Sequence, residues 1–122
     1  MASPANLQYE TLRSFDLNKK KVTESCTIKV GTDDNYFQID NPVYVEDPDA
    51  DLTITVPDGV IIGQKVYIVN KSNSDSKTVT ISVSNHYTSS PETFTISTEG
   101  QNLLLGWDGE RWGTIGGNAT AT

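Results

Sequence analysis

The sequence predicts an all-β fold, a small antiparallel β-sandwich or barrel with an extended N-terminal arm. Between residues 51 and 116, short runs alternate apolar side chains with Thr, Ser or other polar residues, as in Leu52-Thr-Ile-Thr-Val56. Turn-forming residues such as Pro57-Asp58-Gly59 separate these runs. Period-2 alternation is typical of half-buried strands, and short spacing between such strands is typical of sandwiches and barrels.

The chain divides into an N-terminal arm (1–25), a β-domain (26–116) and a flexible C-terminal tail (117–122). Its 122 residues suit a single domain, and an apolar content of 35% predicts a thin core. A partner or further copies of the chain are therefore expected to complete the apolar surface; the alternative is a thin sandwich that is stable alone. The expected strands cover residues 22–30, 36–39, 43–45, 52–56, 64–70, 78–83, 93–97, 101–107 and 110–115.

The run 64–70 has two apolar faces. Val66 and Ile68 share one face, and Tyr67 and Val69 share the other. A strand that is apolar on both faces is expected at the centre of a sheet, covered on both sides.

The last two strands are predicted to form a hairpin around Asp108-Gly109, because Gly accepts positive φ at no steric cost. A two-residue loop places Leu105 opposite Trp112 and Leu103 opposite Thr114. Leu103, Leu105 and Trp112 then lie on one core-facing wall, and a three-residue loop would shift the second strand by one residue.

The arm carries apolar residues whose spacing fits neither a helix nor a strand. Such a segment has too little apolar surface to order itself alone. We expect it to lie across its own domain, a neighbouring copy or a different protein, the alternative being a frayed terminus. The residues expected to bind a partner are Leu7, Tyr9, Leu12 and Phe15.

The net charge is −7, and residues 31–60 hold acidic side chains without any Lys or Arg. Because phosphate contacts need clustered Lys and Arg, the acidic body argues against nucleic-acid binding. No stretch reaches transmembrane length, so no membrane partner is expected. The single cysteine, Cys26, excludes a disulfide framework and is predicted to be a buried structural thiol. Synthesis in a reducing cytoplasm follows from this composition.

Motifs for catalysis or cofactor binding are absent. The single histidine, His86, is expected at the surface, and no Gly-x-Ser-x-Gly elbow or phosphate loop occurs. The only candidate metal site is the acidic loop with Asp47, Asp49 and Asp51. It lacks the Gly and Glu of helix-loop-helix calcium loops, so a solvated loop is the preferred interpretation. We therefore expect a protein that is not an enzyme and needs no cofactor.

Several runs resemble a β-module of tailed-bacteriophage virion proteins, found in tail fibres and in small head decoration (cement) proteins. These runs are Leu52-Thr-Ile-Thr-Val-Pro57, Gly63-Gln-Lys-Val-Tyr-Ile-Val-Asn70, Thr78-Val-Thr-Ile81, Gly100 and Leu105-Gly-Trp-Asp-Gly-x-x-Trp112. The initial Met and the short length favour a complete small protein with an arm before its module. The resemblance then implies a homotrimeric cement protein on the capsid surface, made in the host cytoplasm and bridging major capsid protein subunits.

A second interpretation of the same resemblance is a tail-fibre or receptor-binding module that binds carbohydrate. Such a module needs an exposed aromatic platform. Its candidate residues are Tyr36, Tyr44, Tyr87 and Trp107.

Overall fold

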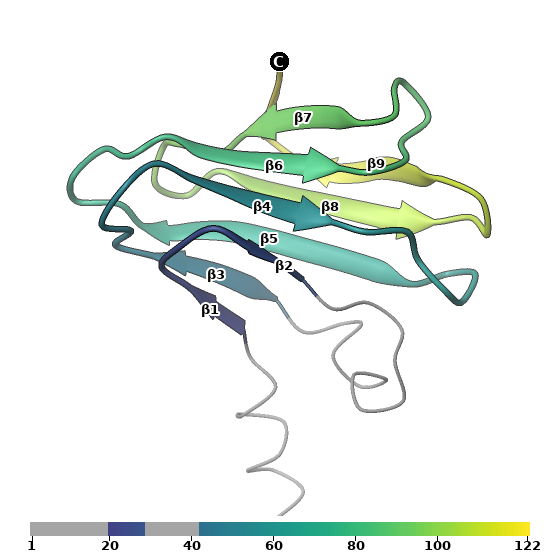
Figure 1. Ribbon diagram of the computed structural model, residues 1–122, viewed down its shortest axis with the longest axis horizontal. Coiled ribbons are helices and arrows are strands. Elements are labelled where there is room, and N and C mark those ends of the chain that lie inside the picture. The colour runs from purple at the N-terminus through teal and green to yellow at the C-terminus, as the bar shows by residue number, and fades with distance from the viewer. Residues whose placement is uncertain (1–19, 29–41) are drawn as a thin grey trace, which may run out of the picture.

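The computed structural model describes residues 20–28 and 42–122, which form two five-stranded β-sheets packed face to face (Figure 1). Sheet A has the strand order β1-β3-β5-β8-β9, and sheet B has the order β10-β7-β6-β4-β2. The strands are β1 (Lys20–Val22), β2 (Cys26–Thr27), β3 (Val43–Glu46), β4 (Leu52–Val56), β5 (Lys65–Ser72), β6 (Val79–Val83), β7 (Glu92–Thr95), β8 (Asn102–Trp107), β9 (Trp112–Gly117) and β10 (Thr120–Ala121).

The all-β prediction is confirmed, and the two sheets form a sandwich and not a closed barrel. The prediction of antiparallel sheets is wrong, because both sheets are mixed. Strands β1, β3 and β5 are parallel in sheet A, and β2, β4 and β6 are parallel in sheet B. Each connection from β1 through to β6 crosses to the other sheet, so successive strands of one sheet run in the same direction along this part of the chain. Side-chain alternation is the same in both kinds of pairing and carries no sign of this path.

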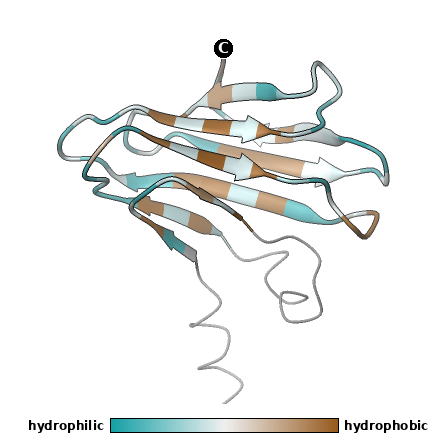
Figure 2. Cartoon of the chain, viewed as in Figure 1, coloured by the Kyte–Doolittle hydropathy of each residue, from teal (hydrophilic) through white to brown (hydrophobic). Residues whose placement is uncertain are grey.

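The core lies between the sheets and is built by the inward side chains that the alternation predicts. In β4, Leu52, Ile54 and Val56 are buried between exposed or half-buried threonines. Strand β6 repeats the pattern with buried valines around Ile81. The brown bands of apolar residues along these strands are visible in Figure 2.

Strand β5 lies at the centre of sheet A, as its two apolar faces predict. Ile68 is fully buried on the inner face, while Tyr67 and Val69 are half-buried on the outer face. The described part of the chain adds no third layer over that outer face, so the expected cover on both sides is not found there.

The β8–β9 hairpin has a four-residue loop, 108–111, and the predicted two-residue loop is wrong. Trp107 pairs with Trp112, and Leu105 pairs with Thr114. The Asp108 carboxylate accepts hydrogen bonds from the backbone N–H groups of Glu110 (2.8 Å) and Arg111 (2.7 Å), which stabilises the longer loop. At Leu105 the shift from the predicted register is two residues, so Leu105 and Trp112 keep the same face.

The predicted core wall of Leu103, Leu105 and Trp112 is therefore confirmed, and all three residues are buried. The pairing of β8 with β9 shifts register between Leu104 and Leu105, so Ile115 has no paired residue on β8. The Ile115 side chain is exposed.

The strand expected at 22–30 is divided. Lys20–Val22 forms β1 in sheet A, and after a turn Cys26–Thr27 forms β2 in sheet B. Val22 is buried, and Cys26 is partly buried against the core. The strand expected at 36–39 lies outside the described residues.

The boundaries of the β-domain also extend beyond 26–116. Strand β1 belongs to the segment expected as an arm, and Thr120–Ala121 in the expected tail pairs with β7 as β10. The tail has no apolar pattern that would predict a strand; Thr122 joins this edge through a backbone hydrogen bond from its N–H to the carbonyl of Thr93 (3.0 Å).

Candidate interaction surface

The two ends of the sandwich differ in chemistry. At one end lie the loops that follow β1, β3, β5 and β7, and at the other lie those that follow β4, β6 and β8 (Figure 1). We call the first the acidic end and the second the apolar end. The acidic end carries the carboxylates Glu24, Asp47, Asp49, Asp51, Asp75 and Glu99.

Two of the three carboxylates in the acidic loop at 47–51 accept hydrogen bonds from the neighbouring β5–β6 loop. Asp47 accepts hydrogen bonds from the backbone N–H (3.1 Å) and hydroxyl (2.9 Å) of Ser74, and these bonds lower the pKa of Asp47. Asp51 accepts a hydrogen bond from the backbone N–H of Thr78 (2.8 Å). Both residues therefore support the β5–β6 loop.

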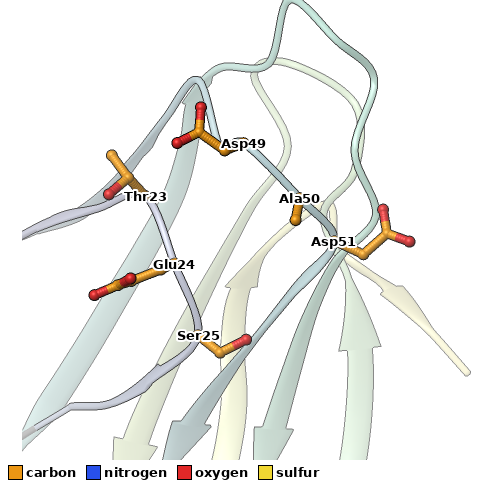
Figure 3. A pocket seen from close by; sticks show the side chains of 6 residues that line it. All are labelled: Thr23, Glu24, Ser25, Asp49, Ala50 and Asp51. Atoms are coloured by element: carbon orange, nitrogen blue, oxygen red, sulfur yellow. The ribbon is translucent and has the colours of Figure 1, made fainter.

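A hollow of about 430 Å³ lies beside this loop. It is lined by Thr23, Glu24, Ser25, Asp49, Ala50 and Asp51. Figure 3 shows that the carboxylates of Glu24, Asp49 and Asp51 point away from one another. Among the residues that the structure describes, no group of three or more His, Cys, Asp or Glu side chains is arranged to hold a metal ion. The hollow therefore offers no formed cation site.

Exposed apolar side chains gather at the apolar end and along the adjoining strand β9. The large apolar residues most exposed in the described ranges are Val60, Ile61, Ile62, Tyr87 and Ile115. Ile62 is 75% exposed and Val60 63% exposed, values usual for charged side chains. The tip of the β4–β5 turn is correspondingly brown in Figure 2. We call these five residues the apolar patch.

The turn that carries the first three patch residues is held by hydrogen bonds. The buried Gln64 accepts hydrogen bonds at its side-chain oxygen from the backbone N–H groups of Val60 and Ile61 (2.8 Å from Ile61). The backbone N–H of Gly63 donates to the carbonyl of Trp107 (2.8 Å), and the N–H of Trp107 donates to the carbonyl of Gln64 (2.9 Å). The apolar tip is therefore fixed to the end of β8.

The patch continues through the β8–β9 hairpin because glycines let side chains lie close to its backbone. A Cβ added at Gly109 would lie 3.0 Å from Ile62, and one at Gly113 would lie 2.7 Å from the Tyr87 ring. Ile115 lies above Gly106, which pairs with Gly113 in the sheet. The turn, Tyr87 and Ile115 thus surround one glycine-lined hairpin.

Tyr87 has polar neighbours as well. Its hydroxyl donates a hydrogen bond to the Asp108 carboxylate, and the Arg111 guanidinium lies 4.8 Å from the centre of its ring. The hydrogen bond raises the pKa of Tyr87 and, with two backbone donors, lowers the pKa of Asp108 to about 2. Asp108 therefore stays ionised across the physiological range.

His86 is buried, and its expected position at the surface is wrong. Its Nε2 lies 2.9 Å from the Thr114 hydroxyl, and its Nδ1 lies 2.9 Å from the Thr88 hydroxyl. The backbone N–H of Thr88 donates to Nδ1 (3.2 Å), which requires Nδ1 without a proton. Burial lowers the pKa of His86, and the nearby Glu92 carboxylate opposes this effect. The ring is thus a neutral support for the 84–91 loop.

We expect His86 to make folding stability depend on pH. Its pKa in the folded state lies below the value of about 6.5 for an unfolded chain, so between these two values the unfolded state binds more protons. The free energy of unfolding should therefore fall as pH falls through this window. Urea unfolding of the wild type and of His86→Gln, from about pH 7.5 to about pH 5.5, should show a smaller slope in the variant. Equal slopes would contradict this role.

The outer faces of the two sheets also differ. In sheet B, neighbouring outward positions form the rows Thr27, Thr55, Ser82, Thr93 and Thr53, Thr80, Thr95, Thr120. In sheet A, the corresponding positions include Tyr44, Tyr67, Val69 and Leu104. Hydroxyl-bearing rows suit contact with water, whereas the outer side of sheet A adds partly exposed apolar area next to Ile115.

The residues singled out from the sequence do not come together in the described structure. Leu7, Tyr9, Leu12 and Phe15 lie outside the described residues, as does Tyr36. Trp107 is buried, so it contributes to no exposed platform. Tyr44 lies 5.7 Å from the Lys71 ammonium on sheet A, whereas Tyr87 belongs to the 84–91 loop.

Sequence reasoning missed the apolar turn. Val60-Ile61-Ile62 lies between the strands expected at 52–56 and 64–70, and the structure places it in a turn that follows Pro57-Asp58-Gly59 and precedes Gly63. Three consecutive β-branched apolar residues between turn-forming residues are the signal that marks an exposed tip.

Comparison of the chain with models of known protein families and with curated proteins gave no match. In the described part of the chain, no helix is long and apolar enough to cross a membrane.

Proposed function

We propose that this chain is a structural virion protein, a capsid decoration (cement) protein that stabilises a phage head by bridging major capsid protein subunits. The observation that carries the proposal is a firmly hydrogen-bonded sandwich with exposed aliphatic residues at one end. The runs that resemble phage β-modules support it, because they fall on β4, β5, β6 and the β8–β9 hairpin of this one sandwich.

The proposed mechanism is addition of buried surface at the junctions between capsid subunits. A protein that binds only the assembled shell shifts the equilibrium toward that shell by mass action. The chain would act as a homotrimer on the capsid surface after synthesis in the host cytoplasm. The sandwich loses little conformational entropy on binding, while the arm contributes Leu7, Tyr9, Leu12 and Phe15 as anchors.

We expect deletion of residues 1–17 to abolish capsid binding while the sandwich stays folded. The deleted residues precede β1, so all the strands that the structure describes are kept. Sedimentation of the truncated chain with undecorated capsids of the phage that encodes it measures binding, and circular dichroism checks the fold.

Two full-length variants separate anchor chemistry from chain length. Serine at Leu7, Tyr9, Leu12 and Phe15 should reproduce the deletion, whereas alanine at Gln8, Glu10, Thr11 and Ser14 should bind like the wild type. Undiminished binding by the truncated chain would remove the arm from the mechanism. A wild type that fails to bind the capsids would refute the cement function.

The alternative function is a tail-fibre or receptor-binding module that binds carbohydrate. It is favoured by Tyr87, whose half-exposed ring lies beside the Asp108 carboxylate and the Arg111 guanidinium. A ring for stacking and polar groups at its edge are the elements that sugar binding needs. Saturable binding to a glycan array that Tyr87→Ala removes would support this function over the first.

A further inference from the structure

We propose that the apolar patch is the surface through which copies of this chain associate with one another. This inference deepens the proposed function and rests on its self-associating subunits, because it names the surface that joins them. The patch is formed by Val60, Ile61, Ile62, Tyr87 and Ile115.

The first argument is the concentration of exposed apolar residues. The large, strongly exposed apolar side chains of the described ranges belong to the β4–β5 turn, the 84–91 loop and β9, around one glycine-lined hairpin. The outer face of sheet B carries rows of threonine and serine instead. Scattered single apolar residues need no explanation, but a contiguous patch of this kind is typical of an interaction site.

The second argument is rigidity. The Gln64 side chain fixes the backbone of Val60 and Ile61, and the Gly63 N–H ties the turn to Trp107. The Tyr87 ring is held by Asp108 on one side and by Arg111 on the other. A surface already fixed in one conformation loses little entropy when it is buried, which favours binding.

The third argument is charge, and it selects a second copy as the occupant. Six carboxylates lie at the acidic end, away from the patch, in a chain of net charge −7. Near the patch, Lys65 and Arg111 offset two of the four carboxylates of Asp58, Glu92, Asp108 and Glu110. Copies that meet through their apolar ends keep apart the acidic ends, which carry the larger number of carboxylates, whereas a contact through an acidic end would bring more carboxylates together.

The fourth argument is size. A stable interface buries roughly 800 Å² on each partner, far more than three residues of one turn supply. The patch spreads over two loops and β9, beside the partly exposed Leu104 and Tyr67 of the adjoining sheet. A closed symmetric assembly would bury this surface on every copy.

The experiment measures the molar mass of the purified chain by light scattering after size exclusion. The wild type is expected near three times the chain mass of 13.3 kDa. The double variant Ile62→Asp with Ile115→Asp is expected near the mass of one chain, a threefold decrease. The matched control Thr53→Asp adds a charge at an exposed position of sheet B and should keep the wild-type mass.

Thermal unfolding establishes that the variants are folded. If the double variant has a lower unfolding temperature than the wild type, the single variant Ile62→Asp provides the test, because the Ile62 side chain is mostly exposed on a turn. A wild type with the mass of one chain, or folded patch variants that keep the wild-type mass, would overturn the inference. Because no capsid is present in this measurement, its results are independent of the cement function. A chain that assembles with itself but does not bind capsids would refute only the cement function.

Discussion

Replacing Trp112 with alanine is expected to lower the free energy of unfolding by about 3–5 kcal/mol, the largest effect of any single substitution considered. The side chain is fully buried and lies 5.2 Å from Trp107, measured between ring centres. Its indole N–H donates a hydrogen bond to the carbonyl of Pro57 (2.8 Å), which joins β9 to the beginning of the β4–β5 turn. Alanine would leave a cavity and a carbonyl without its donor.

Urea unfolding followed by circular dichroism measures this loss. Since domains of this size are stable by only about 5–15 kcal/mol, much of the variant should be unfolded at moderate temperature. Trp112→Phe keeps a ring but removes the N–H donor and part of the buried volume, so it should cost less than alanine and still include the loss of the Pro57 bond. A loss below about 1 kcal/mol for the alanine variant would show that the site collapses around the cavity.

Gly59→Ala is expected to cost about 1–3 kcal/mol through overpacking and to displace the apolar turn. A Cβ at Gly59 would lie 2.6 Å from Cδ2 and 2.8 Å from Cδ1 of the Trp107 indole. Trp107 is buried, and its ring packs against that of Trp112. The strain should therefore pass to residues 60–62, changing both tryptophan fluorescence and, through the apolar patch, the association of copies.

Gly116→Ala is the matched control for this substitution. A Cβ there would meet Leu104 at 3.6 Å, an ordinary van der Waals contact, in the same sheet. Its effect on the free energy of unfolding should stay within about 0.5 kcal/mol. Similar stabilities of the Gly59 and Gly116 variants would show that the turn accommodates the methyl group at no cost.

Much of the sandwich could be predicted because alternation reports burial directly. Leu52, Ile54 and Val56 face the core as expected, and so do Leu103 and Leu105. The central position of β5 was visible in its two apolar faces. These features depend on the order of apolar and polar side chains within a single strand, and that order can be read directly from the sequence.

Features that depend on how strands meet could not be predicted in the same way. The path from sheet to sheet makes β1, β3 and β5 parallel, and no side-chain pattern distinguishes that pairing. The loop at 108–111 was misjudged because the Asp108 carboxylate, and not only Gly109, determines its length. His86 looked like a surface residue because its threonine partners come from the same loop and from β9.

The candidate surface was the least predictable part. Val60, Ile61 and Ile62 have the composition of a strand, although turn-forming residues lie on both sides of them, and the hydrogen bonds of Gln64 and Gly63 show that they form a turn. The patch also joins residues far apart in the sequence, such as Ile62 and Ile115, through the β8–β9 hairpin. Such neighbourhoods follow from the fold and not from local pattern.

The winding of the chain between the two sheets has a consequence for the order of folding. Lys20 pairs with Val43 and Val43 with Ile68, whereas Trp107 and Trp112 pair across one short loop. Contacts between distant residues carry a larger loop-closure cost and form more slowly. The β8–β9 hairpin is therefore expected to form before sheet A is complete, because β1, β3 and β8 reach their partner strands only across long stretches of chain. During synthesis, β1 leaves the ribosome before β3 and cannot take its place in the sheet until β3 has followed.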